Sequence, residues 1–96
     1  MGILKTLMEK YGISVREARR RIMKAAVEAY KAILAELGLE KGNRALHRTV
    51  MKTVLPLVWK VIREEQRFPA SDEVLRQLKY MKPDFVGSLR RLVVKV

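Results

Sequence analysis

Cysteine is absent from this 96-residue chain, and histidine occurs only once, as His47. Without thiols the protein forms no disulfide and no thiolate metal site, and it has no cysteine nucleophile. His47 falls on the apolar side of a predicted helix, which is typical of a hydrogen-bonded core residue. The acidic residues are scattered and there is no glycine-rich phosphate loop, whereas acid–base catalysis needs a positioned pair of titratable groups. We therefore expect a binding protein rather than an enzyme, with no metal, cofactor or small-molecule substrate.

Long apolar runs are also missing. A membrane-spanning helix needs about 20 predominantly apolar residues, and residues 1–9 lack the pattern of a secretory signal. We therefore expect a cytoplasmic protein with no membrane partner, associated with the nucleoid or, if the chain is viral, with the virion. Asparagine and glutamine are scarce beside abundant Lys, Arg and Glu, which favours a thermophilic source.

Acidic residues are few compared with basic ones: 10 Asp and Glu against 21 Lys and Arg, a net charge of +11. Such an excess repels itself in a compact monomer and is typical of proteins with a polyanionic partner. Hydrophobic residues make up 49% of the chain, which is enough for one small core. Because so short a chain has little interior for broad apolar helix faces, we expect a homo-oligomer.

Apolar residues recur at helical spacing in five segments, and no repeat or linker divides them. This pattern predicts an all-α protein, a compact bundle of about five helices forming one nucleic-acid-binding domain over residues 1–96. Two predicted helices are long, at about residues 14–37 and 43–66, and three are short, at about residues 2–11, 71–82 and 84–96. Gly12 and Gly38 fit the left-handed caps that end the first two.

Helix starts and interruptions are marked by particular residues. Ser14 and Glu17 fit a capping box, in which the serine caps a backbone N–H and the glutamate reaches back. Asn43 and Ser71 are good N-caps for later helices. Pro56 lies on the polar side of the second long helix, where we expect a kink around the core; a break into two helices near Leu55 is the alternative. The last segment, which ends in Val93–Val96, is read as a helix because no partner strand is available.

The second long helix has the most informative charge pattern, because residues 41–63 contain no acid. Arg48, Lys52, Lys60 and Arg63 fall within one third of its helical wheel, opposite Val54 and Val61. A face of one sign forgoes the stabilising pairs that mixed charges form, and phosphate binding would explain it. Trp59 lies beside this arc, where it would stack on a base or, as we favour, pack at the edge of the core.

Two further basic clusters accompany this arc. One opens the first long helix, and the other, which includes Lys82 and Lys95, surrounds the last turn of the chain. Together the three clusters supply the residues that we expect to contact nucleic acid: Arg16, Arg19, Arg20, Lys24, Arg44, Arg48, Lys52, Lys60, Arg63, Arg90 and Arg91.

Residues 3–22 resemble a helix-turn-helix unit of DNA-binding proteins. In this resemblance a short helix ends at Gly12, Ile13 plugs the turn, Ser14 caps the next helix, and basic residues open that helix. In that family the second helix enters the major groove. The resemblance implies that Arg16, Arg19 and Arg20 face DNA and that Ser14 contacts a phosphate. Met8 and Arg21 depart from the pattern, since a small and a branched apolar residue are usual there.

These observations favour a non-enzymatic nucleic-acid-binding protein that prefers duplex DNA to RNA. It would be an architectural or packaging protein, or a small regulator. The alternative is a small basic helical subunit of a ribonucleoprotein or replication assembly, which would bind RNA or single strands and a larger protein.

Overall fold

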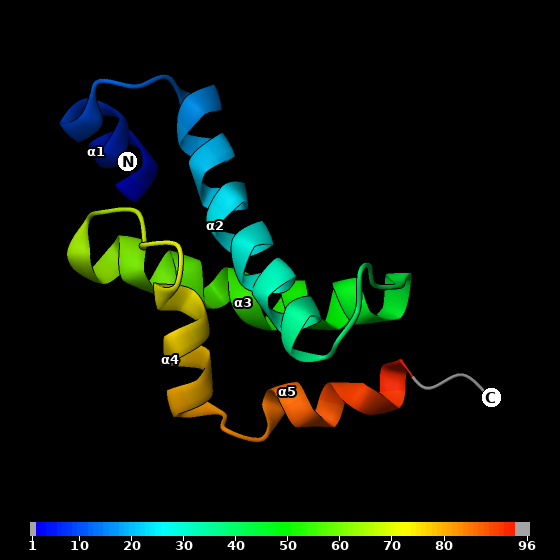
Figure 1. The fold of residues 1–96 in the computed structure, drawn as a ribbon. Coiled ribbons are helices and arrows are strands. Elements are labelled where there is room, and N and C mark those ends of the chain that lie inside the picture. Colours follow the sequence, from blue (N-terminus) through cyan, green and yellow to red (C-terminus); the bar gives the residue numbers. More distant parts are fainter. Residues whose placement is uncertain (1, 94–96) are drawn as a thin grey trace.

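Helices make up the regular structure of residues 2–93, the part of the chain that the computed structural model describes (Figure 1). The all-α prediction, with two long and three short helices, is confirmed. The last helix is shorter than predicted and continues as a 3-10 helix, while residues 94–96 lie outside the described part, and with them Lys95 and most of the Val93–Val96 segment. The elements in chain order are α1 (Ile3–Tyr11), α2 (Val15–Glu36), α3 (Arg44–Glu65), α4 (Glu73–Met81), α5 (Phe85–Ser88) and the 3-10 helix η1 (Leu89–Leu92).

Capping interactions between near neighbours set the ends of the first three helices. Gly12 adopts the left-handed conformation, with φ of 63°, and ends α1. The hydroxyl oxygen of Ser14 accepts a hydrogen bond of 3.1 Å from the backbone N–H of Glu17 and begins α2. The Asn43 side chain accepts one of 2.8 Å from the N–H of Leu46 and begins α3. These three boundaries are confirmed as the sequence predicts them.

Two details of the capping predictions are wrong. The Glu17 carboxylate does not complete the capping box, because it binds the guanidinium groups of Arg20 and Arg21 instead. The cap of α4 is Asp72 rather than Ser71, and its side chain makes no capping hydrogen bond. At Glu17 the two arginines outcompete the expected bond to the backbone, because hydrogen bonds between charged groups are the stronger ones.

Pro56 lies inside α3 without ending it. The helix runs unbroken from Arg44 to Glu65, so the alternative of two helices near Leu55 is wrong. Pro56 is exposed, on the side of the helix away from the core. Because proline has no N–H, the carbonyl oxygen of Lys52 lacks its helical donor. The kink at Pro56 stays a prediction.

The core forms where α2 crosses α3 (Figure 1). Ala26 and Ala29 of α2 are fully buried, and their small side chains let the two helices approach closely. α1, α4 and η1 each add a buried leucine to the same cluster. Beside those two alanines, the fully buried side chains of this cluster are Leu7, Ile33, Leu46, Val50, Val54, Val58, Ile62 and Leu78.

Four residues that the helical spacing of the sequence places on apolar faces are exposed: Tyr11, Val15, His47 and Met81. Tyr11, Val15 and Met81 expose 39%, 39% and 51% of their surface, and each is the first or last residue of its helix. His47 is exposed too, so its assignment to the core is wrong. It lies in the first turn of α3, where Tyr30 contacts it edge-on at 5.0 Å between ring centroids.

An ionic network holds α4 against the end of α3. The two terminal nitrogens of Arg67 donate hydrogen bonds of 2.8 and 2.7 Å to the two carboxylate oxygens of Glu73. The N–H of Ala70 donates another of 3.0 Å to the same carboxylate. The hydrogen bonds from Arg67 hold the pKa of Glu73 at about 2, below its ordinary 4.5. This network fixes the turn between α3 and α4, and with it the groove described below.

Candidate nucleic-acid interface

The outward face of α3 carries the row of cations that the sequence predicts, which we call the α3 stripe: Arg48, Lys52, Lys60 and Arg63. Arg48, Lys52 and Arg63 are exposed and Lys60 is half-buried. The opposite side of the helix is fully or almost fully buried through Val50, Val54, Val58 and Val61, as the sequence predicts.

The positive charge of the α3 stripe is little compensated. Among the described residues, Arg48, Lys52 and Arg63 make no ion pair, while Lys60 pairs with Glu64 at 3.3 Å. Apart from Glu64, the acids that form pairs bind arginines and lysines outside the stripe. Its field therefore extends into solvent, where a phosphate would meet it.

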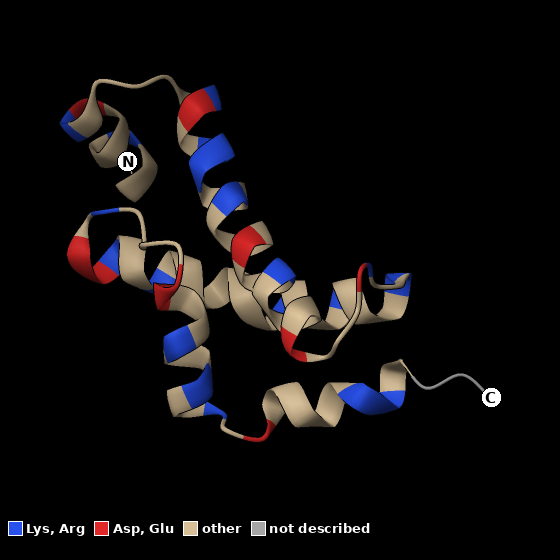
Figure 2. Ribbon diagram, viewed as in Figure 1, with Lys and Arg blue, Asp and Glu red and all other residues tan. Residues whose placement is uncertain are grey.

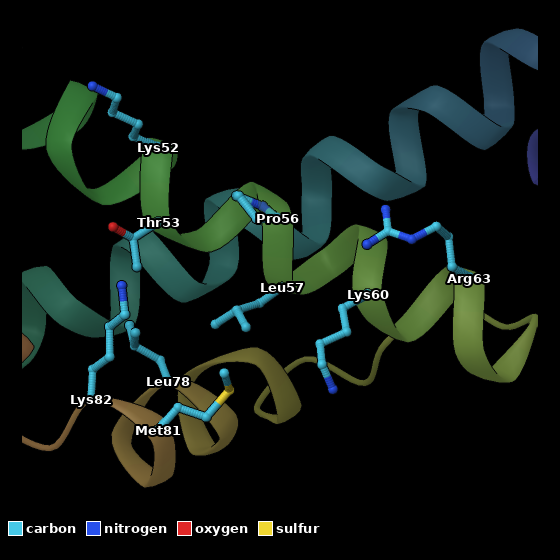
Figure 3. Close-up of a pocket in the computed structure, with 9 residues that line it drawn as sticks. All are labelled: Lys52, Thr53, Pro56, Leu57, Lys60, Arg63, Leu78, Met81 and Lys82. Atoms are coloured by element: carbon cyan, nitrogen blue, oxygen red, sulfur yellow. The ribbon is translucent and has the colours of Figure 1, made fainter.

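A groove between α3 and α4 runs beside this stripe and has a volume of about 370 Å³. Figure 3 shows Lys82, from the end of α4, rising toward Thr53 and facing α3 across the groove. The sequence assigns Lys82 to a different basic cluster, and only the packing of α4 on α3 brings it here. The lining residues are Lys52, Thr53, Pro56, Leu57, Lys60, Arg63, Leu78, Met81 and Lys82.

A second cluster, the α2 patch, lies on the first half of α2 and consists of Arg16, Arg19 and Lys24. All three are exposed and make no ion pair among the described residues. On a helical wheel Arg19 falls inside the apolar arc of this helix, near Ala26 and Tyr30, but the structure exposes it, so that prediction is wrong. Figure 2 shows that basic residues recur along α2, with acidic residues between them.

The two arginines next to the α2 patch, Arg20 and Arg21, both form ion pairs with Glu17. Arg20 donates two hydrogen bonds of 2.9 Å to the Glu17 carboxylate, and Arg21 donates one of 2.9 Å. These hydrogen bonds, of which those from Arg20 have the largest effect, hold the pKa of Glu17 at about 2. The hydrogen bond to Glu17 also raises the pKa of Arg20. The Arg21 guanidinium also lies 6.0 Å from the Tyr11 ring and 5.6 Å from the Phe68 ring. Arg20 is thus a weaker candidate for nucleic-acid contact than its neighbours.

The α3 stripe and the α2 patch lie on opposite sides of the molecule. α2 and α3 pack on each other through their buried faces, so their outward faces point apart. α2 lies in front of α3 in Figure 2 and behind it in Figure 3. The structure does not join the basic clusters of the sequence into one surface.

The remaining predicted residues lie at one end of α3. The Asn43 side chain donates a hydrogen bond of 3.1 Å to the carbonyl oxygen of Leu92, which brings η1 to the start of this helix. Arg44, Arg90 and Arg91 are exposed there, and the Arg91 guanidinium donates to the Ser88 carbonyl oxygen at 3.3 Å. They extend the positive surface away from the groove.

Neither a metal-binding cluster of side chains nor a membrane-spanning helix occurs within residues 2–93. No group of three or more His, Cys, Asp or Glu side chains within residues 2–93 has the arrangement to hold a metal ion. In that same range no helix has the length and apolar character to cross a membrane. Comparison with protein-family models, curated proteins and solved structures returned no match, so the interpretation rests on the residues themselves.

Proposed function

We propose that this protein is a non-enzymatic nucleic-acid-binding protein that binds duplex DNA through the α3 stripe. The observation that carries the proposal is the row of cations on the outward face of α3, of which only Lys60 makes an ion pair among the described residues, in a stretch of chain (residues 41–63) without an acid. Arg48 and Arg63 are 15 residues apart, which spans about 22 Å along a helix. A duplex carries one phosphate charge about every 1.7 Å of its axis, so phosphates lie within reach of every cation in the row.

The aromatic residue beside the α3 stripe supports duplex DNA over single strands. Proteins that bind single strands stack bases on exposed aromatic rings. Trp59, the one Phe, Trp or Tyr of α3, is half-buried and packs against the core. The outward face of this helix therefore offers charge without a stacking platform, which suits a paired, negatively charged backbone.

The expected binding is strongly salt-dependent and nearly independent of base sequence, because cations that contact phosphates position a protein without reading bases. Fluorescence anisotropy with a 20-base-pair duplex, over a series of salt concentrations, measures this. If about six phosphates are neutralised, the logarithm of the binding constant falls against the logarithm of salt concentration with a slope of about −5. A slope near zero would remove the electrostatic interpretation.

Two further probes test the choice of nucleic acid. Single-stranded DNA and duplex RNA of matched length are titrated in the same buffer. Tighter binding of either one would favour the alternative function, a small subunit of a ribonucleoprotein or replication assembly.

A further inference from the structure

Because the α3 stripe and the α2 patch lie on opposite sides of the molecule, a single DNA duplex does not contact both. A rigid duplex that lies along α3 cannot also reach the outer side of α2, because the buried core separates the two faces. Yet Arg16, Arg19 and Lys24 make no ion pair among the described residues, and in this they match the stripe residues Arg48, Lys52 and Arg63. A single bound duplex would leave the charge of the α2 patch without a partner.

We propose that one copy of the protein bridges two DNA duplexes, one on the α3 stripe and the other on the α2 patch. This inference rests on the proposed function and adds a second binding face to it. The bridged duplexes would be held apart by the thickness of the protein, as in an architectural or packaging role.

The size of the molecule makes bridging physically feasible. Its extents are 49 × 25 × 19 Å, so the body of the protein can hold two duplexes on opposite faces up to about 19 Å apart along its shortest axis. The Debye length is about 8 Å at physiological salt, so the repulsion between two backbones at that separation is largely screened. The cations on the two faces then neutralise phosphates without forcing the two duplexes into contact.

The test is a capture experiment with two duplexes. One 40-base-pair duplex is biotinylated and fixed to beads, and a second of the same length carries a fluorophore and is free in solution. The parent protein should retain the fluorescent duplex on the beads. Retention should rise and then fall with increasing protein, because an excess of protein coats each duplex separately and leaves no second face to share.

Variants of each face separate bridging from simple binding. The double variant Arg16→Glu with Lys24→Glu alters the α2 patch, and Lys52→Glu with Arg63→Glu alters the α3 stripe. Each is assayed at a concentration that saturates its binding to one duplex by anisotropy. Both should bind one duplex and lose capture of the second by at least about fivefold. A matched control, Lys5→Glu with Lys41→Glu, changes the net charge equally at two exposed residues off both faces and should capture like the parent.

The outcomes distinguish the two proposals. If the parent binds no duplex by anisotropy, the proposed function fails. If it binds one duplex but captures no second one, only bridging fails. If the α2-patch variant captures as well as the parent, two copies of the α3 stripe do the bridging and the inference is overturned. Circular dichroism melting of each variant checks that the fold is retained.

Discussion

Reversing two charges of the α3 stripe is the most direct perturbation of the proposed DNA-binding surface. In the variant Lys52→Glu with Arg63→Glu, both altered side chains are exposed and neither makes an ion pair among the described residues. Exposed substitutions of this kind usually change the free energy of unfolding by no more than about 0.5 kcal/mol. We therefore expect the variant to fold like the parent and to differ from it in binding.

The magnitude of the loss follows from the number of phosphate contacts removed. Each neutralised phosphate of duplex DNA contributes about 0.9 to the salt slope, so losing two contacts reduces the slope by about 1.8. The ratio of parent to variant affinity should then grow about 3.5-fold each time the salt concentration is halved. At 0.1 M salt we expect the affinity to fall about tenfold or more, because the new glutamates also repel the phosphates.

The assay is anisotropy with a labelled duplex at four or more salt concentrations. The control variant Lys5→Glu with Lys41→Glu separates local contact from total charge. Each exchange of a basic residue for an acidic one removes two charges, so both variants carry +7 instead of the parent's +11. The control should keep the parent's slope.

Two results would refute the reasoning. If the stripe variant and the control variant lose affinity for the duplex by the same factor, binding depends on total charge and the α3 stripe is not a DNA-binding site. If the stripe variant is folded and binds as tightly as the parent, the stripe is only a solvated face. The α2 patch, with Arg16, Arg19 and Lys24, would then be the better candidate.

The remaining predictions concern stability. Glu73→Gln should lower the free energy of unfolding by about 2 kcal/mol at pH 7, because the neutral amide cannot pair with Arg67. The folded pKa of Glu73 is about 2 and its ordinary value is 4.5, so the difference in unfolding free energy between parent and variant is complete above pH 4.5 and is lost as the pH falls through 2. Urea titrations at pH 7 and pH 3 measure this difference. A difference that is undiminished at pH 3 would contradict the ion pair. Gly38→Ala should cost about 1 kcal/mol, because Gly38 has a φ of 75°, which alanine adopts poorly. Thermal melting measures the latter, and an unchanged melting temperature would argue against that conformation.

Local patterns in the sequence predict most of the helices of the structure. Ser14 and Asn43 cap α2 and α3 as expected, and the valines on one side of α3 are buried as expected. These features depend on residues within about four positions of one another, so neighbouring residues alone specify them. The last helix was overestimated, because a repeated apolar spacing does not show where an α-helix tightens into η1.

The amino-acid sequence alone specifies the helical class, the N-caps of α2 and α3, and the sign and placement of charge along each helix. Which charges meet and which stay free depends on how the helices pack. Glu73 binds Arg67 across the turn before α4, and Lys82 joins the groove beside α3, through contacts between segments that no periodic pattern links. The packing of α2 on α3 also turns their basic faces to opposite sides. The physical reason is that helical periodicity gives each cation a direction relative to its own helix, whereas burial of apolar faces between helices sets those directions relative to one another.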